Sequence, residues 1–321
     1  MKYFLTAIIT FSYCCVTFSQ QTENLFIPLE FQNAYETGTR DINGVPGKNY
    51  WQNESFYSID AQIHPEEKTI QASSNITYKN NSPDTLSILV LRLYHDLYKK
   101  GNARDRDIHP KDITDGIALK SLKVNDSKIK LDNSFTTRRT GTNLFLRIPK
   151  ALNPGDSLLL SVEWQTKIPE NSLIRMGAVD ESTMFVAYWY PQISVYDDID
   201  GWDFFDYGSR QEFYQDLAGF DVTLEVPADY MVWATGDLNN NSEIYTKNVL
   251  TSLEKASQSD ETIPIVKSRN KNLKAKKGNV EWEFTANKVP DFAFSLSNHY
   301  HWDASSVVLD SSTMDRVMVH T

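Results

Sequence analysis

The chain has 321 residues, a net charge of -10 and an apolar fraction of 40%, enough to bury the core of one large or two ordinary globular domains. Its acidic residues are scattered and no basic face is evident, so the composition argues against nucleic acid as a partner. The only two cysteines are Cys14 and Cys15.

The amino-terminal segment, residues 1–19, has the parts of a secretory signal peptide. A basic residue precedes an apolar run over residues 3–18, with small residues near its end. The run is too short for a membrane span, so we expect an exported mature chain without a transmembrane segment, in the periplasm, the outer cell envelope or outside the cell. Lipidation of Cys14 stays an alternative, although Tyr13 is not the small residue that it requires. Cleavage would remove both cysteines, and with them any disulfide or thiolate zinc site.

Alternating segments follow a polar leader. The leader is expected to be extended over residues 20–49, and one domain is expected over residues 50–321. Residues 56–63 and 69–78 alternate between apolar and polar side chains on either side of a turn, which predicts an antiparallel hairpin. The more continuous apolar run over residues 87–94 predicts a strand that is central in its sheet or buried on both faces.

Two further hairpins are predicted, one pairing residues 119–124 with 128–131 and one pairing 143–148 with 157–166. Later strands are predicted at residues 219–227, 230–235, 281–286, 292–296 and 317–321. Apolar residues at helical spacing predict one short helix near residues 246–259. The pattern is therefore mainly β and indicates an antiparallel β-sandwich or open barrel. Because the last residues still alternate as a strand, we expect the sequence to be a fragment of a longer protein.

The segment over residues 188–214 is the densest in chemistry-bearing side chains, with ten aromatic and six acidic residues. The acidic run over residues 197–200, followed by Gly201, invites a calcium-site interpretation. If Gly201 were the sixth position of an EF-hand loop, Tyr196 and Tyr207 would take the first and twelfth positions, where carboxylates are needed. That motif fails, which leaves turn-forming aspartates as the favoured interpretation and a different calcium site as the alternative.

Aromatic side chains interleaved with acids are also typical of carbohydrate-binding surfaces, and two of the carboxylates could act as a glycosidase acid and base. The favoured interpretation is that the aromatic residues are core and interface anchors. These residues are Trp189, Tyr190, Trp202, Phe204 and Phe205.

Histidine gives one further candidate, since His299, His301 and Asp303 would share one face of a strand and could together hold a metal. A structural role is favoured because no additional ligand has a recognisable spacing. The sequence contains no His-Glu-x-x-His, no Gly-x-Ser-x-Gly and no phosphate-binding glycine loop. We therefore predict no catalytic residue and no metal ligand in this chain.

Short motifs spread over residues 50–310 stand in a definite order and spacing. They are Tyr50-Trp51-Gln52, Leu86 to Tyr94, Trp189-Tyr190-Pro191-Gln192, Val195 to Trp202, Glu212-Phe213-Tyr214, Phe220-Asp221-Val222, Val226-Pro227, Ala234 to Leu238 and Asp291 to Phe294. Together they resemble the amino-terminal β-domain of bacterial aminopeptidase N-like zinc metallopeptidases, a gluzincin family.

The resemblance implies a saddle-shaped antiparallel β-domain that packs over the active site of a thermolysin-like catalytic domain. In that family the zinc-binding His-Glu-x-x-His lies beyond the β-domain, so the zinc is expected in a catalytic domain that this sequence lacks. The chain is then expected to bind no cofactor itself and to hydrolyse nothing unaided. Its expected partners are a peptide substrate and that catalytic domain.

Many relatives carry a Gln or Glu before the proline-containing motif, where it receives the free amino group of the substrate. Residues 184–188 contain neither. The candidate rim of the substrate cleft consists of Tyr188, Gln192 and Glu212, with Glu212 as one acid that could take over the amine-binding role. The alternative is a stand-alone β-rich module of the cell envelope that binds carbohydrate or peptide.

Overall fold

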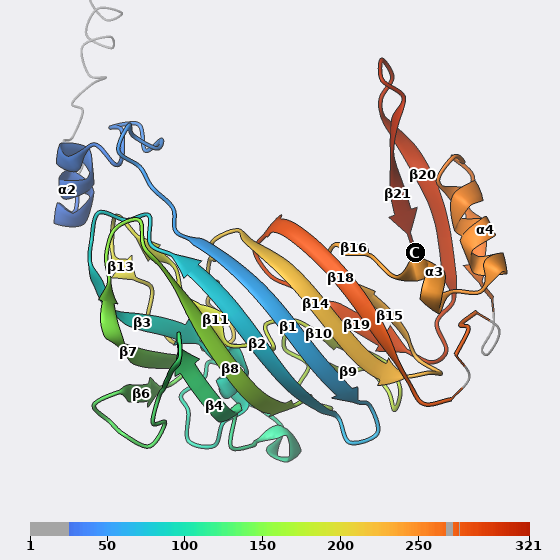
Figure 1. Ribbon diagram of the computed structural model, residues 1–321, viewed down its shortest axis with the longest axis horizontal. Helices are drawn as coiled ribbons and strands as arrows, with labels where there is room; N and C mark the ends of the chain where they lie inside the picture. Colours follow the sequence, from blue (N-terminus) through green and yellow to red (C-terminus); the bar gives the residue numbers. More distant parts are fainter. Residues whose placement is uncertain (1–25, 268–271, 276) are drawn as a thin grey trace, which may run out of the picture. The chain divides into compact units, whose positions relative to one another are not determined.

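The computed structural model describes residues 26–267, 272–275 and 277–321, and strands predominate in them (Figure 1). The predicted mainly β fold is confirmed, with several antiparallel sheets and a few helices. Contacts divide the chain into two units, one ending at Tyr50 and including Asp198–Asp200, the other formed by Trp51–Asp197 and Gly201–Thr321. The predicted signal peptide, residues 1–19, lies outside the described residues.

The first unit contains helix α2, Leu29–Thr37, in a segment that was expected to be extended. The helix ends at Gly38, whose φ of 73° is a left-handed conformation that glycine adopts without a steric penalty. The amide of Gly38 donates back to the carbonyl groups of the last turn. The prediction of an extended leader was therefore wrong for residues 29–37. The one sequence feature that marks the end of this helix is Gly38, and a single glycine in a polar stretch does not by itself predict a helix.

The largest sheet has eight strands in the order β16-β18-β14-β1-β2-β8-β4-β5 (Figure 1). Their bounds are β1 Glu54–His64, β2 Thr69–Lys79, β4 Ala118–Val124, β5 Ser127–Lys128, β8 Ser157–Lys167, β14 Ala218–Pro227, β16 Asp237–Leu238 and β18 Asn279–Val289. The β1–β2 hairpin confirms the first sequence prediction. The β4–β5 hairpin is also present, but β5 ends at Lys128, so the strand predicted to continue to residue 131 is shorter.

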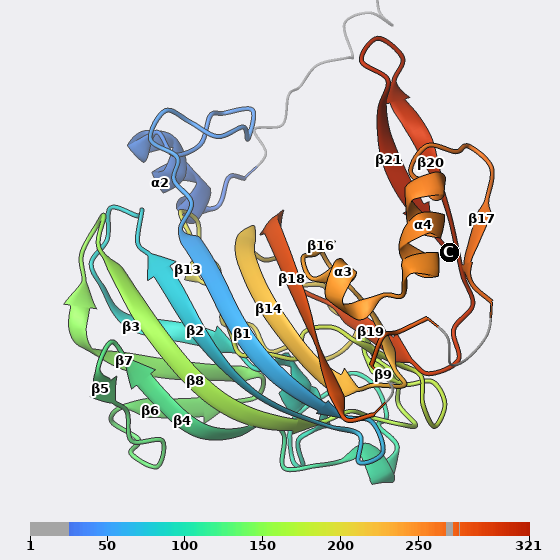
Figure 2. The ribbon, with the colours of Figure 1, turned by 45° about the vertical axis from the view of Figure 1, so that its right-hand side comes forward.

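The centre of this sheet holds a parallel pair, β1 with β14 (Figure 2). In this pair Phe56 lies opposite Gly219 and Gln62 lies opposite Glu225. The other neighbours in the sheet pair in antiparallel fashion. Parallel neighbours cannot be joined by a tight turn and need a long crossover connection. Here the connection from β1 to β14 contains β2 to β13. The aromatic and acidic residues 188–214 therefore belong to the connection between the two central strands.

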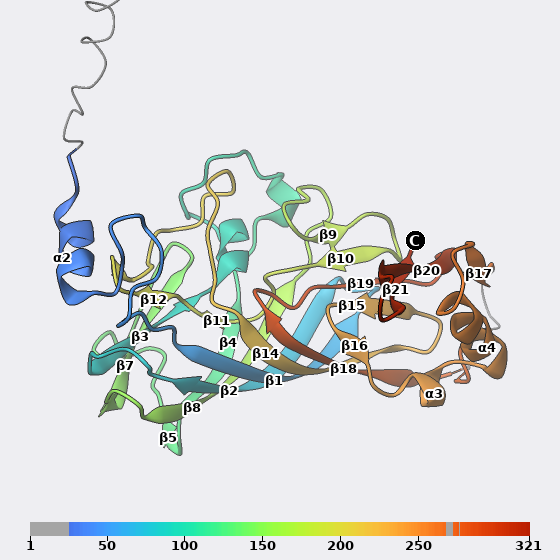
Figure 3. The same ribbon diagram turned by 90° about the horizontal axis from the view of Figure 1, so that it is seen from above.

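Smaller antiparallel sheets complete the second unit (Figure 3). Two have four strands, in the orders β15-β19-β10-β9 and β11-β3-β7-β6; β12 pairs with β13; and a three-stranded sheet has the order β17-β20-β21. The bounds are β3 Leu86–Arg92, β6 Thr137–Thr140, β7 Asn143–Leu152, β9 Gly177–Ala178, β10 Met184–Val186, β11 Gln192–Ile193, β12 Tyr196–Asp197, β13 Gly201–Trp202, β15 Met231–Ala234, β17 Ile263–Val266, β19 Phe294–Ser297, β20 Trp302–Asp310 and β21 Asp315–His320. As predicted, β3 is central, between β11 and β7.

The third predicted hairpin was wrong, because β7 and β8 belong to different sheets. Strand β7 pairs with β3 and β6, whereas β8 lies between β2 and β4. The turn between them pairs with Asn80, which donates to the carbonyl of Asp156 at 3.0 Å and accepts from the amide of Gly155 at 2.6 Å. The turn thus carries the chain from one layer to the other, and strand alternation alone does not distinguish this from a hairpin.

The core lies between the eight-stranded sheet and the smaller sheets. Alternate residues of β8 and β14 are buried, among them Trp164 and Phe220. Trp164 contacts Trp189 with ring centroids 6.0 Å apart, and Phe220 contacts Phe292 at 5.9 Å. Each such side chain contributes about 1.5–3 kcal/mol by leaving water. Trp189 is therefore a core anchor, as the sequence predicted.

Helix α4, Lys247–Ala256, confirms the predicted short helix and packs on strands β17 and β20 (Figure 2). Further short helical segments are α3, Asn241–Ile244, and two 3₁₀ turns, Tyr94–Tyr98 and Pro110–Asp112. The first 3₁₀ turn directly follows β3 and is buried throughout. It positions Tyr94 beside the aromatic and acidic segment.

Candidate functional site

Four aromatic rings from distant parts of the sequence form a compact group, named here the Phe213 cluster: Tyr94, Tyr188, Tyr207 and Phe213. Tyr94 begins the 3₁₀ turn after β3, and Tyr188 follows β10. Tyr207 and Phe213 lie in residues 203–217, a segment without helix or strand. Two of its members, Tyr94 and Tyr207, belong with Leu97 and Tyr98 to a buried group that is separate from the main core, and Tyr188 and Phe213 pack against that group.

Phe213 is the centre of this cluster. Its ring stacks on Tyr94 at 4.3 Å and meets Tyr188 and Tyr207 edge-on at 4.9 Å and 5.0 Å. Edge-to-face and offset-stacked rings gain about 0.5–1.5 kcal/mol per pair beyond their burial. The cluster therefore fixes a segment that has no backbone ladder of its own.

Arg175 and Glu212 form an ion pair at the exposed edge of the cluster. Nη2 of Arg175 donates to both carboxylate oxygens of Glu212 at 2.5 Å. The guanidinium lies 5.6 Å from the ring centroid of Phe213 and 5.9 Å from that of Tyr188. A hydrogen bond with Tyr207 and the charge of Glu212 raise the pKa of Arg175. The arginine is thus held by rings and by a carboxylate.

Gln192 lies beneath the cluster and is joined to it through a second glutamine. The side-chain amides of Gln192 and Gln215 exchange two hydrogen bonds, of 2.5 Å and 2.6 Å. Gln215 also donates to the hydroxyl of Tyr94 at 3.1 Å. Burial raises the pKa of Tyr94 to about 12, so its hydroxyl stays protonated at neutral pH.

A buried arginine supports the cluster from the sheet side. Arg92, 2% exposed, donates to Asn143 at 2.8 Å and lies 3.8 Å from a carboxylate oxygen of Asp203. Its guanidinium is 5.1 Å from the ring centroid of Tyr94. A buried charge is tolerated only when it is paired and hydrogen-bonded, so Arg92 and Asp203 depend on each other.

The backbone is strained at Arg175 and at Tyr188, whose ring lies against the guanidinium of Arg175. Arg175 has a φ of 58° and Tyr188 has a φ of 55°, values that non-glycine residues rarely adopt. The amide of Tyr188 donates to Asp291 at 3.2 Å, which helps hold that conformation. Strain of this kind costs about 1–3 kcal/mol and clusters at binding sites.

Asp291 connects the segment after β18 to the segment after β10. It accepts a hydrogen bond from the hydroxyl of Tyr190 at 2.9 Å, in addition to the amide of Tyr188. Burial raises the pKa of Asp291 to about 6. The neighbouring residues add two further bonds, since Trp189 donates to the carbonyl of Phe292 at 3.0 Å and Gln192 to that of Pro290 at 3.1 Å.

The three residues predicted for the cleft rim therefore lie in one neighbourhood. Tyr188 is a member of the Phe213 cluster, Glu212 pairs with Arg175 at its edge, and Gln192 reaches it through Gln215. Sequence reasoning missed Arg175, which lies in a segment without periodicity. The signal for Phe213 was present in the Glu212-Phe213-Tyr214 motif.

The histidine candidates do not meet. His299 lies outside the strands and its Nε2 is 3.3 Å from a carboxylate oxygen of Asp180, while Asp303 lies in β20. Within residues 26–267, 272–275 and 277–321, no three His, Cys, Asp or Glu side chains are grouped to hold a metal ion.

The acidic run at residues 197–200 begins with the last residue of β12 and continues into the turn between β12 and β13. Within the first unit, the guanidinium of Arg40 donates to both carboxylate oxygens of Asp198, the shortest bond being 2.7 Å. This pairing lowers the pKa of Asp198 against the opposing effect of its burial. The carboxylate is thus committed to an arginine.

The predicted aromatic anchors divide into two groups. Trp189 and Tyr190 are buried, as expected, whereas Phe204 and Phe205 are 53% and 70% exposed. The two phenylalanine rings stack on each other 5.8 Å apart. Of the predicted roles, core or interface anchor, the core role is wrong for these two rings, and their exposed stacked faces are available for contacts with another molecule. Trp202 is partly buried and packs against the core.

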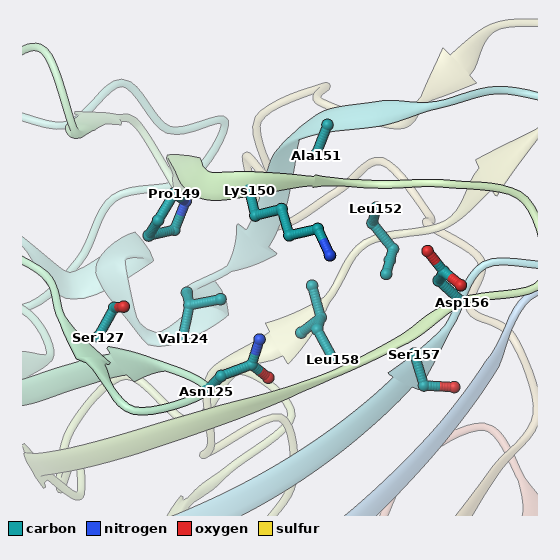
Figure 4. A pocket seen from close by; sticks show the side chains of 10 residues that line it. All are labelled: Val124, Asn125, Ser127, Pro149, Lys150, Ala151, Leu152, Asp156, Ser157 and Leu158. Carbon is teal, nitrogen blue, oxygen red and sulfur yellow. The ribbon is translucent and has the colours of Figure 1, made fainter.

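A pocket of about 310 Å³ lies between β7, β8 and the turn after β4 (Figure 4). No member of the Phe213 cluster lines it. Lys150 points into it over the apolar side chains of Leu152 and Leu158 (Figure 4). None of the residues predicted for the cleft rim lines this pocket.

No helix in the described residues is long and apolar enough to cross a membrane. No family model matches the chain, and no curated protein matches it.

The chain is similar in structure to an M1 zinc metallopeptidase from Deinococcus radiodurans, at 13% identity and a TM-score of 0.43, over 82% of this chain and 45% of that one. A variant of that enzyme bound to a Tyr-Ser-Ala substrate is similar at 12% identity and a TM-score of 0.45, over 86% of this chain and 49% of that one. The chain spans about half the length of these structures.

Proposed function

We propose that the chain is the amino-terminal, non-catalytic β-domain of an exported zinc-dependent metallopeptidase of the aminopeptidase N type. In this proposal the domain packs over the active site of a catalytic domain that carries the zinc. The Phe213 cluster, which includes Tyr188, forms part of the rim that receives the peptide, together with Gln192 and Glu212. The chain alone supplies binding and orientation but not hydrolysis.

One observation carries the proposal: separate motifs of the family resemblance are joined by direct hydrogen bonds. Trp189 and Gln192 of one motif bond to the backbone of Phe292 and Pro290, and Tyr190 bonds to Asp291. These contacts give the weak individual motifs a shared structural reason. They support a common fold element rather than a chance run of aromatic residues.

The Arg175 contact also bears on the amine-binding role suggested for Glu212. Both oxygens of Glu212 are engaged by Arg175, so a substrate amino group would compete with a guanidinium. Asp291 is the other acid beside Tyr188, but it is buried. Peptide capture by Glu212 therefore requires Arg175 to give way, and the proposal keeps amine binding at this rim without assigning it to one residue.

The test uses the full product of the gene, including the sequence that it encodes after residue 321; this product is called the extended chain below. We expect one bound zinc per extended chain and release of the amino-terminal residue from aminoacyl p-nitroanilides. A Tyr188→Ala variant should raise KM more than it lowers kcat, because the ring orients substrate but does not react. An extended product without zinc, or with zinc and no peptidase activity, would overturn the proposal.

A second candidate is a stand-alone cell-envelope module that binds carbohydrate or peptide. The exposed stacked pair Phe204 and Phe205 favours it, because flat aromatic faces bind sugar rings. Saturable oligosaccharide binding by the 321-residue chain, lost in Phe205→Ala, would support this candidate over the peptidase domain.

A further inference from the structure

The ion pair of Arg175 and Glu212 combines a fixed cation with a displaceable anion. The side chain of Arg175 is 37% exposed, whereas that of Glu212 is 76% exposed. Phe213 and Tyr188 hold the guanidinium from its ring-facing side. The backbone next to Glu212 is fixed by the ring contacts of Phe213, so the two partners differ in the exposure of their side chains.

The contact of Glu212 uses one nitrogen of the guanidinium. Both of its oxygens accept from Nη2, whereas a guanidinium can present two nitrogens side by side to a carboxylate. A ligand carboxylate that met two nitrogens would have better geometry than the internal one. An exposed ion pair also contributes little to stability, so its exchange for another carboxylate costs little.

The backbone strain at Arg175 and Tyr188 indicates that this arrangement has a use. Positive φ values at two residues whose side chains touch are costly, and such strain persists where it positions a binding group. The guanidinium lies at the exposed edge of the Phe213 cluster, where Glu212 meets it.

From these contacts we infer that Arg175 is a receptor for a carboxylate of the peptide ligand, and that Glu212 occupies it as an internal competitor until the ligand arrives. The net charge of -10 opposes non-specific carboxylate binding, so the interaction depends on the fixed guanidinium. The rings of Tyr188 and Phe213 can pack against the adjoining apolar side chain. That the ligand is a peptide rests on the proposed function.

The carboxylate can be the carboxyl terminus of the peptide or an acidic side chain, and the probes distinguish them. Four short peptides are titrated into the 321-residue chain by calorimetry: Ala-Ala-Phe and Ala-Glu-Phe, each with a free and an amidated carboxyl terminus. N-acetyl-phenylalanine serves as a carboxylate that is not a peptide. The same titrations are made on Glu212→Gln and Arg175→Gln.

We expect Glu212→Gln to bind the carboxylate-bearing probes about three- to fivefold more tightly than the unmodified chain, which is the gain from removing one exposed competitor. Arg175→Gln should lose that binding. If peptides bind every variant, but neither free Ala-Ala-Phe nor either form of Ala-Glu-Phe gains affinity from Glu212→Gln or loses it in Arg175→Gln, the receptor is overturned and the peptide-binding proposal survives. If N-acetyl-phenylalanine binds through Arg175 but no peptide does, the carboxylate receptor stands and the peptide role falls.

A control separates loss of competition from loosening of the segment over residues 203–217. Asp197→Asn weakens the hydrogen bond from Tyr214 and so frees the same segment without touching Glu212. Unchanged affinity in Asp197→Asn supports the competitor role. An equal gain in Asp197→Asn and Glu212→Gln would overturn it, since mobility alone would then explain both.

Discussion

Asp291 accepts a hydrogen bond from the hydroxyl of Tyr190 at 2.9 Å, while burial raises the pKa of the same carboxyl to about 6. The hydrogen bond favours the ionised form and burial opposes it, and burial prevails. A carboxyl that loses its proton near pH 6 in the folded chain, but near 3.8 in the unfolded chain, makes stability fall as pH rises from about 4 to 6.

The first prediction follows from this sign. Asp291→Asn should remove that fall, so the free energy of unfolding of the variant relative to the unmodified chain should rise between pH 4 and 6, by about 3 kcal/mol at most. Urea unfolding at pH 4, 5, 6 and 7.5 measures it. Asp60→Asn, at an exposed position of β1, serves as the control and should leave the slope unchanged.

The second prediction concerns the opposite slope from His95. Burial lowers the pKa of His95 to about 4, partly opposed by the backbone of Lys167. The unfolded chain then takes up a proton near pH 6.5 while the folded chain does not, so stability falls as pH drops from 6.5 to 4. His95→Phe should flatten this loss in urea unfolding. His301→Gln, at an exposed position, is the control and should show the full loss. An equal loss of stability in the two variants would contradict the prediction.

The third prediction tests Phe213 as the centre of its cluster. Phe213→Ala removes ring contacts with three tyrosines and should cost about 2–3 kcal/mol, below the range for a fully buried phenylalanine because the ring is partly exposed. Near-ultraviolet circular dichroism should lose tyrosine signal. Phe204→Ala, at an exposed ring, should change the free energy of unfolding by less than about 0.5 kcal/mol.

The fourth prediction concerns the buried charge of Arg92. Arg92→Leu leaves Asp203 without its cation and should cost about 3–5 kcal/mol. The double variant with Asp203→Asn should recover part of that loss, because the remaining uncompensated charge is then removed. Simple addition of the two single effects in a double-mutant cycle would show that the pair is not coupled.

Local patterns in the sequence predicted the local structure well. The alternation over residues 56–63 and 69–78 predicted the β1–β2 hairpin, because two-residue periodicity places one face of each strand in the core. The helical spacing near residues 246–259 predicted α4. The failures occurred where pairing depends on distant segments, as with β7 and β8, since a turn does not reveal whether its strands share a sheet.

The candidate site shows the same limit. Motif order led to Tyr188, Gln192 and Glu212, which do lie in one neighbourhood. Arg175 could not be identified, because nothing in the spacing of residues 167–176 indicates that its side chain will lie against Phe213. The exposure of Phe204 was also unpredictable, since aromatic density indicates burial only on average.

The parallel pairing of β1 with β14 has a consequence for how the chain is made. Phe56 finds its partner Gly219 only after four other strands of the same sheet have been synthesised. Contacts so distant in sequence form slowly, and until they form the hydrogen-bonding edge of β1 is open to other chains. Synthesis that pauses before residue 218 should therefore leave an aggregation-prone nascent chain, and a chaperone that shields β1 would matter most during that interval.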